Sequence, residues 1–495
     1  MRTQDGRMRR IHLTDRVLVA AAWLFSGVMA GVPALPADGQ VFAPGPASAA
    51  VGRGGPAYVY GSEALFLNPA NIALETRGAI EISSGRAIIG AGGNLLQFRF
   101  YNEVFTSGET ITDEERQRVL SEWFGGADSG HLRSASVVAE AVPVAVIHAR
   151  GSGTLAYSMR MRSHASVSIN GGWLDLLLSG TEQDRAIPLD GQFGLMSTTE
   201  LGVTYARKLA PRLALGATTK LVFGNDFTDA RLESVATITD ASVTHDFDYV
   251  VRAAGGISSD FVDHVDFFSK DAFGGGGFSP SFLSATGFGM GMDVGGTFPA
   301  SPEVRLSASL TDLGFIRWSG AAQTIRPAGN SFTFDGLVLD IDRIRDEHDG
   351  NVGDYLLSSI DSLASLSYRD VERSRGSFST ALPTTLHLGA AWTPAGTRAT
   401  VIGGTSAPLF ASPVRPAAFP DVHVGAEYEP GGTVRFPLRA GLQLGGSSAM
   451  MLSFGFGVHS PRFDFDLGVA ATPRSDLMGA GARYTAAVSA ITVRI

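Results

Sequence analysis

The feature that most constrains this chain is a strict alternation of apolar and polar residues in which the polar side is charged. In residues 462–469, one side carries Phe463, Phe465, Leu467 and Val469, and the other carries Arg462, Asp464, Asp466 and Gly468. In residues 434–444, Val434, Phe436, Leu438, Ala440, Leu442 and Leu444 alternate with a side that includes Arg435, Arg439 and Gln443. A period of two residues indicates a β-strand. Basic residues of one strand and acidic residues of another therefore share one polar side.

Runs of this kind recur from Ala79 to the end of the chain. Clear examples are residues 155–162, 212–223, 303–310, 385–392 and 452–459. We count about fourteen, each near the ~9–11 residues with which a tilted strand crosses a bilayer. The strands of a soluble β-sandwich also alternate apolar and polar residues. Here, however, the runs do not alternate with helical segments as in an α/β protein, and the Gly-rich polar sides suit a crowded lumen. The sequence predicts an all-β fold, a transmembrane antiparallel β-barrel over residues 79–495.

The last run, residues 487–495, places Ile491, Val493 and Ile495 on one side and Thr492 and Arg494 on the other. A strand at this position suits closure of a barrel, because its edge would otherwise be left unpaired. The run also resembles the terminal strand that outer-membrane assembly machinery reads, with Ile495 where an aromatic residue is commonest.

Composition and the N-terminus indicate an exported protein. With a formal net charge of −9, the chain lacks the concentrated basic surface that a nucleic-acid partner needs. It has no cysteine, which excludes disulfides, thiolate metal sites and a lipidated cysteine. Arg7, Arg9 and Arg10 precede an apolar run over residues 17–30, which is shorter than a membrane-spanning helix. We expect a signal peptide over residues 1–37, cleaved between residues 30 and 50, and the outer membrane of a diderm (Gram-negative-type) bacterium.

A compact piece precedes the strands at residues 61–74. Its Asn68-Pro69-Ala70 step is a turn, because proline fixes φ and pushes the preceding residue out of the helical region. The stretch resembles the short plug, with its Asn-Pro-Ala motif, that opens FadL-like and PorV-like outer-membrane barrels. The resemblance implies a plug over residues 51–78.

Three segments between the strands stand out. Residues 112–124 predict a helix with a capping box from Thr112 to Glu115, ended by Gly125 and Gly126. Residues 255–287 hold a run of four glycines, Gly274 to Gly277, among aromatic residues and predict a flexible loop. Its ligand-contact candidates are Phe267, Phe268, Phe273 and Phe278. Residues 340–375 are highly charged; without EF-hand spacing, a solvated loop helix is favoured there over a Ca²⁺ site.

Three short motifs carry a further resemblance. Residues 309–318, with Asp312-Leu313-Gly314, together with residues 291–296 and residues 381–389, with Leu382-Pro383-Thr384, resemble an uncharacterised family of exported barrels related to the FadL-like group. The resemblance covers most of the mature chain. It implies an architecture and carries no chemistry.

The sequence indicates neither an enzyme nor a metal or cofactor site, because no hydrolase elbow, zinc motif or nucleotide loop is present. His387, His423 and His459 each fall on the polar side of an expected strand, so all three are lumen candidates. We further expect Arg435 and Arg439 to face Asp464 and Asp466 across the interior, since an Arg in mid-bilayer would cost ~2–4 kcal/mol.

Two functions fit these expectations. The barrel is either a FadL-like channel for small molecules, hydrophobic ones among them, or a plugged scaffold that docks envelope or secretion proteins, as the PorV-like resemblance implies. The first requires an apolar route to a gap in the wall, and the second a sealed lumen with apolar external loops. Outer-membrane lipid is a partner in both.

Overall fold

Antiparallel strands make up most of the computed structural model, and all the described residues lie within one unit, residues 38–495. The structure describes residues 45–74, 79–95, 111–126, 131–151, 153–179, 184–240, 242–256, 285–334, 371–410, 420–446, 450–472, 483–489 and 491–495. The expected signal peptide, the Phe267 to Phe278 loop and the charged stretch of residues 340–370 lie outside these ranges.

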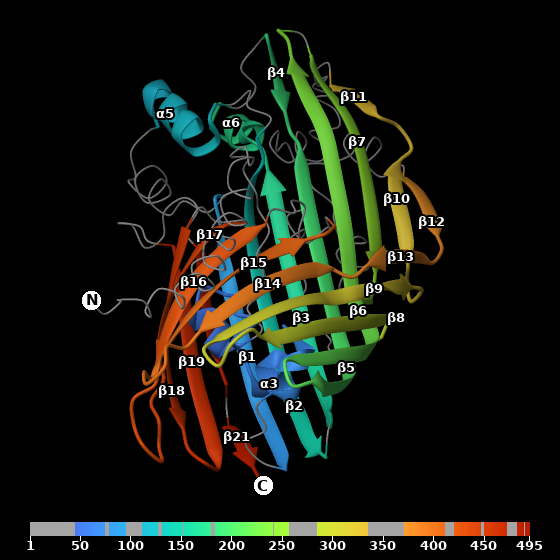
Figure 1. Ribbon diagram of the computed structural model, residues 1–495. Helices are drawn as coiled ribbons and strands as arrows, with labels where there is room; N and C mark the ends of the chain where they lie inside the picture. The colour runs from blue at the N-terminus through green and yellow to red at the C-terminus, as the bar shows by residue number, and fades with distance from the viewer. Residues whose placement is uncertain are drawn as a thin grey trace, which may run out of the picture. The chain divides into compact units, whose positions relative to one another are not determined.

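Neighbouring strands in the barrel wall pair with each other along almost their whole length (Figure 1). The wall strands are β1 (Ile80–Gly93), β2 (Arg133–Arg150), β3 (Gly153–Ile169), β5 (Gly191–Ala210), β6 (Leu213–Ile238), β8 (Gly287–Pro299), β9 (Val304–Trp318), β13 (Phe378–Ala381), β14 (Thr385–Trp392), β15 (Ala399–Pro408), β16 (Asp421–Tyr428), β17 (Leu438–Gly445), β18 (Met450–His459), β19 (Phe463–Ala471), β20 (Arg483–Val488) and β21 (Ile491–Arg494). With β13 continuing β14, and β20 continuing into β21, the described strands form a closed antiparallel barrel of 14 strands. The predicted fold class and strand number are confirmed.

Closure is made by the two ends of the described strand series. β1 pairs with β2 on one side and with β20 and β21 on the other, so that Glu81 is opposite Arg494 and Ala87 is opposite Val488. Ile80 and Ile495 also exchange backbone hydrogen bonds at 3.1 and 2.9 Å. The pairing leaves neither strand with a free edge along these residues.

Burial is inverted relative to a soluble β-protein. Along β18 and β19, Phe454 and Leu467 are 58% and 42% exposed, whereas Ser453 and Asp464 are 1% and 5% exposed. The apolar side of the alternating pattern therefore faces outward and the polar side faces the interior. A soluble β-sandwich would show the opposite arrangement.

The outer band is wide and almost free of charge on the strands that form it. Its exposed apolar side chains include Leu201, Val203, Leu215, Leu221, Met290, Met292, Leu306, Leu313, Leu388, Val401, Val424, Leu438 and Leu452.

A smaller sheet extends the barrel at one end. The second half of β6 leaves β8 and pairs instead with β7 (Val243–Ala254), and β4 (Arg185–Pro188), β10 (Gln323–Pro327), β11 (Ser331–Phe334) and β12 (Val371–Arg375) add to it. In Figure 1, β6 and β7 run side by side beyond the ends of β8 and β9. The outward side of this part is charged, with Arg231 and Glu233 exposed where Leu215 and Leu221 are exposed lower on the same strand.

The described helices are short. They are α2 (Pro46–Ala50), α3 (Gly61–Ala64), the 3₁₀ helix η1 (Pro69–Ala73), α5 (Asp113–Phe124) and α6 (Gly171–Ser179). The prediction for residues 112–124 is confirmed: Thr112 and Glu115 form the capping box, and Gly125 ends α5 in the left-handed conformation at φ 81°. No helix among the described residues is long and apolar enough to cross a membrane.

One expected strand is shorter than its pattern. Residues 434–444 alternate throughout, but β17 begins only at Leu438, and Arg435 makes an isolated bridge to His459. Pro437 lies between the two and has no N–H to donate, so the ladder is interrupted there. The expected last strand is similarly divided into β20 and β21 around Ser489, whose hydroxyl accepts a bond from the Asp466 N–H.

Candidate functional site

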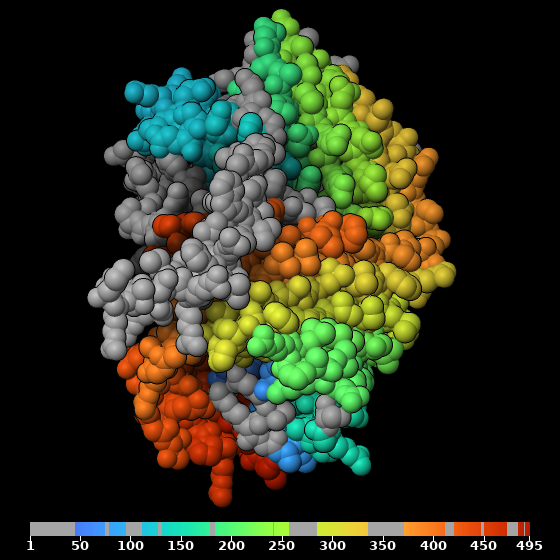
Figure 2. Space-filling model, viewed as in Figure 1, coloured from blue at the N-terminus to red at the C-terminus, as the bar shows by residue number. Residues whose placement is uncertain are grey.

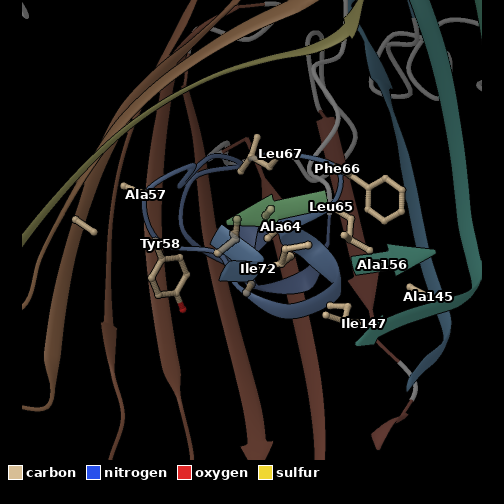
Figure 3. Close-up of a cluster of buried hydrophobic side chains, with 14 of the residues drawn as sticks. Ala57, Tyr58, Ala64, Leu65, Phe66, Leu67, Ile72, Ala145, Ile147 and Ala156 are labelled. Atoms are coloured by element: carbon tan, nitrogen blue, oxygen red, sulfur yellow. The ribbon is translucent and has the colours of Figure 1, made fainter. Parts of the chain in front are cut away.

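The N-terminal segment, residues 45–74, lies inside the barrel. Tyr58, Leu65, Phe66 and Ile72 are each 7% exposed or less and pack with wall residues such as Ile147 (Figure 3). The segment is also tied to itself, because the Glu63 carboxylate of α3 accepts the Ala47 and Ser48 N–H groups of α2 at 2.9 and 3.1 Å. Burial raises the pKa of Glu63, against the opposing effects of Arg86 and of these two bonds.

The Asn-Pro-Ala motif docks this segment on β8. Asn68 is extended and caps η1 by accepting the Ala70 N–H, and Pro69 occupies the first helical position, where no N–H is needed. The Asn68 amide donates to Thr297 Oγ1 at 2.8 Å and to the Pro56 carbonyl at 3.0 Å. On the neighbouring strand β9, Ser309 Oγ donates to the Leu67 carbonyl at 2.5 Å.

Two wall glycines make this docking possible. A Cβ on Gly295 would lie 2.1 Å from Asn68 Oδ1, and a Cβ on Gly216 would lie 2.5 Å from the Ala70 nitrogen. Both distances are far below van der Waals contact. Glycine therefore lets the backbone of the segment approach β6 and β8 closely.

The other end of the segment docks on β16, β17 and β18. Gly52 N–H donates to Ser453 Oγ at 2.9 Å, and Gly55 N–H donates to His423 Nε2 at 3.1 Å. The Tyr58 hydroxyl bonds Glu427 and accepts from Arg439 Nε at 2.7 Å. Burial raises the pKa of the Tyr58 phenol well above its usual range, although Arg439 acts against the shift. The segment is thus held at two sites on the barrel wall, one on β8 and β9 and one on β16 to β18.

The residues expected to line the lumen contact different partners. Arg439 Nη1 lies 2.5 Å from Asp466 Oδ1, and His459 Nε2 lies 3.0 Å from the same carboxylate. Arg435 instead pairs with Glu429 at 2.8 Å, and Asp464 pairs with Arg494 at 2.9 Å.

Of the expected group of Arg435, Arg439, Asp464 and Asp466, Arg439 and Asp466 therefore pair with each other, whereas Arg435 and Asp464 have other partners. The pairing register explains this division. It sets Asp464 opposite Thr492, beside Arg494, and an isolated bridge joins Arg435 to His459. His459 Nδ1 also lies 3.4 Å from Glu429, so this histidine links the pair of Arg435 and Glu429 to Asp466. His387 bonds Thr311 and Ser406 at 3.1 and 2.8 Å, and His423 contacts the N-terminal segment, so the three histidines serve different places in the interior.

A larger buried charge cluster crosses six adjacent strands, and the sequence analysis did not identify it as a unit. The cluster consists of Glu140 (β2), Arg160 and Arg162 (β3), Glu200 (β5), Lys220 (β6), Asp293 (β8) and Asp312 (β9), each at most 6% exposed. Arg160 pairs with Glu140 at 2.9 Å, Arg162 Nη1 with Asp312 at 2.8 Å and Lys220 with Asp293 at 2.7 Å. Shorter contacts join Arg162 to Glu200 and Lys220 to Asp312. Buried charges of both signs therefore satisfy one another here.

Phe66 connects the N-terminal segment to this cluster. The guanidinium carbons of Arg86 and Arg160 lie 4.8 and 5.0 Å from the centre of its ring. A cation within about 6 Å of a ring centroid is attracted by the negative face of the ring. Phe66 thus adds a third contact region on β1 and β3.

A further interruption of the barrel wall lies between β9 and the strand that β13 and β14 form. Pairing is regular from Val304 to Thr311 with β14 and resumes at Phe315 with β13. Across the three residues between, the Leu382 N–H donates to the Gly314 carbonyl at 2.9 Å, and Thr384 Oγ1 donates to the Asp312 carbonyl at 2.8 Å. Where β9 pairs regularly with β14, its yellow surface lies directly against the orange surface of β14 (Figure 2).

Two of the three motifs singled out in the sequence, Asp312-Leu313-Gly314 and Leu382-Pro383-Thr384, meet at this interruption. Asp312 has φ 57°, a left-handed conformation that Asp tolerates better than most residues. A Cβ on Gly314 would lie 2.1 Å from the Met290 carbonyl. Pro383, which has no N–H, stands where no ladder bond is required.

Just inside the interruption lies an apolar cluster. Its residues are Met196, Val222, Phe227, Ala254, Ile316, Trp318, Ala322 and Leu382, with Phe378 packed against them. Trp318 is fully buried, and its indole donates to Thr380 Oγ1 at 2.9 Å. The interior therefore has an apolar part beside the interruption and a charged part next to it.

The closed strand series, enclosing an N-terminal segment, defines the chain as a β-barrel with the fold of the FadL-like channels. The chain belongs to DUF5723, a family of unknown function, whose profile matches residues 69–468. A comparison with curated proteins gives no match.

Several solved structures are similar to this one, among them hydrocarbon channels and transporters. A deltaS2 mutant of the TodX monoaromatic hydrocarbon channel has a TM-score of 0.51 at 11% identity, over 91% of this chain and 98% of that chain. The Ralstonia pickettii toluene transporter TbuX has a TM-score of 0.46 at 12% identity, over 91% and 98%. A Pseudomonas aeruginosa FadL homologue has a TM-score of 0.47 at 11% identity, over 92% and 99%. At these identities the likeness is one of fold, and the TodX mutant carries it.

Proposed function

We propose that this protein is an outer-membrane channel that passes small apolar molecules, with the N-terminal segment as its plug. The observation that carries the proposal is the buried apolar cluster around Trp318, which lies directly inside the interruption between β9 and β13. Only two hydrogen bonds join the strands across those three residues. A small apolar molecule would move from this cluster through the wall at that point, and the charged part of the interior would not be on its path.

The outer surface supports a membrane location. Phe288 and Phe298 are exposed at opposite ends of β8. At about 3.3 Å per residue and a strand tilt of about 40°, they stand about 25 Å apart along the barrel axis, the height of the apolar band of outer-membrane barrels. Exposed aromatic residues at the same level as Phe298, including Trp392 and Tyr428, match the aromatic girdle that such barrels place at the lipid interface. As part of the same proposal, residues 1–37 are a signal peptide that directs export of the protein.

The experiment is uptake by intact cells of a diderm host, because their lipopolysaccharide slows passive entry of apolar solutes. Cells that carry the protein should take up labelled toluene faster than matched cells without it, and uptake of glucose should not rise. Equal toluene uptake in both strains would contradict a channel for apolar molecules. A parallel rise in glucose uptake would indicate a general diffusion pore.

The second candidate is a scaffold that docks envelope proteins, and the extension beyond the barrel favours it. The β6 to β7 hairpin carries exposed Arg231, Glu233, Asp246 and Asp248 on its outward side. This surface is charged, unlike the apolar external loops expected for a scaffold, so a protein partner would have to recognise it by complementary charge. Toluene uptake that does not depend on the protein, together with co-purification that is lost when residues 229–254 are replaced by a short turn, would support the scaffold instead.

A further inference from the structure

Asp312 belongs to two features at once. Its backbone lies at the wall interruption, and its side chain lies in the buried charge cluster. β8 and β9 are in register at Met292 with Leu313 and at Val294 with Leu310, so two residues of β9 face the single residue Asp293. This bulge places Asp312 in its left-handed conformation, and the Asp312 N–H donates to Asp293 Oδ1 at 2.6 Å.

Two cations hold the carboxylate of Asp312. Arg162 Nη1 lies 2.8 Å from Oδ2, and Lys220 Nζ contacts Oδ1. Lys220 also holds Asp293 at 2.7 Å, and so it links both strands that flank the bulge. All four side chains are buried, so these contacts are little screened by water.

The interruption itself has little else to hold it. The Asp312 carbonyl accepts one of the two bonds across it, from Thr384 Oγ1, and Gly314 accepts the other. Leu313, between these two acceptors, is 41% exposed on the outer side, whereas Leu382, whose N–H bonds the Gly314 carbonyl, is 1% exposed in the interior. A shift of residues 312–314 would break both bonds.

We propose that Arg162 and Lys220, acting through Asp312, form a latch that keeps the interruption in the wall closed. The inference rests on the proposed function in placing a lateral route at this point. Asp312 is a positioning residue: it contacts no transported molecule, and it fixes residues 312–314 against β13. Loss of the carboxylate charge would leave Arg162 only Glu200 and Lys220 only Asp293 as close partners, and it would release this part of β9.

The test is Asp312→Asn in lipid nanodiscs, followed by amide hydrogen exchange and mass spectrometry. Asn keeps the size of Asp and tolerates the left-handed conformation, so the substitution removes mainly the charge. We expect exchange in peptides covering residues 310–318 and 380–386 to become at least about tenfold faster, because losing one partner of a buried pair is strongly destabilising. Lys220→Met should produce the same local change.

Asp466→Asn is the control, since it removes another carboxylate of the barrel interior, which pairs with Arg439 and lies outside the charge cluster. It should leave exchange at residues 310–318 and 380–386 unchanged. Unaltered exchange there in both Asp312→Asn and Lys220→Met would overturn the latch, and so would an equal acceleration over the whole barrel. Toluene uptake by the wild-type protein is a separate readout: if uptake is absent while the local acceleration is seen, the proposed function fails and the latch stands.

Discussion

The Asn68 side-chain amide donates a hydrogen bond to Thr297 Oγ1 at 2.8 Å, joining two residues that are 229 positions apart in the chain. Thr297 Oγ1 in turn donates to Asn71 Oδ1 at 2.6 Å, so one wall hydroxyl serves both ends of the first turn of η1. This junction fixes the position of the N-terminal segment relative to β8. The junction also requires Gly295, two residues before Thr297 on β8, to have no side chain.

Gly295→Ala should weaken the docking of the segment. The new methyl group would lie 2.1 Å from Asn68 Oδ1 and displace the amide from Thr297, leaving buried polar groups unpaired at a cost of about 1–3 kcal/mol. The free energy of unfolding from urea titration in detergent measures the loss. Gly296→Ala is the control, because its Cβ would meet only the flexible Leu215 side chain at 3.2 Å. An equal loss in both variants would contradict the assigned role of Gly295.

Tyr58→Phe should destabilise the other docking site. The hydroxyl both bonds Glu427 and accepts from Arg439, and all three groups are buried. We expect a loss of about 1–3 kcal/mol in the free energy of unfolding. Tyr205→Phe removes a hydroxyl from a side chain that is 53% exposed on the outer side, and it should be nearly neutral. Identical unfolding curves for wild type and Tyr58→Phe would argue against this site.

Deletion of residues 61–74 should raise ion conductance in planar bilayers. These residues carry the Asn68 junction and Phe66, and a barrel of 14 strands is wide enough to need filling beyond its own side chains. The exposed interior would then be lined by the charged groups that Phe66 now contacts, Arg86 and Arg160. An intact protein that already conducts like an open porin, with no change on deletion, would refute the plug.

Phe454→Arg should impair assembly into lipid. Phe454 lies mid-way along β18 and is 58% exposed within the apolar band, where an arginine costs about 2–4 kcal/mol. Val235→Arg is the control, because Val235 is 38% exposed on the β6 to β7 extension, beyond the band. The heat-modifiable shift of the folded barrel on a gel measures the folded fraction. Equal folding yields for both variants would place the lipid boundary elsewhere.

The alternation of side chains was enough to predict the barrel, because burial on a strand follows a period of two whatever its neighbours are. Residues 462–469 show this: the expected apolar side is the exposed side of β19, and Asp464 and Asp466 point inward. The helix over residues 112–124 was equally predictable, because the capping box from Thr112 to Glu115 is a local signal.

The charge cluster could not be predicted in the same way. Arg160, Arg162 and Lys220 were visible on polar sides of their strands, but their partners lie on other strands, and only the register brings them together. The bulge at Asp312 shifts that register by one residue, which no period-two pattern reports. Arg435 shows the same limit, since the interruption at Pro437 gives it Glu429 as partner in place of an aspartate.

The pairing of β1 with β21 has a consequence for the order of assembly. Glu81 and Arg494 meet although they are 413 positions apart, so the contact that completes the ring is among the most distant in the chain and is correspondingly slow to form. The N-terminal segment needs β8 and β16 to β18 for its docking, and these strands are made long after it. Residues 45–74 therefore have to be retained by the growing sheet before the ring is complete, and the contacts of Phe66 with Arg86 of β1 and Arg160 of β3 provide the earliest opportunity.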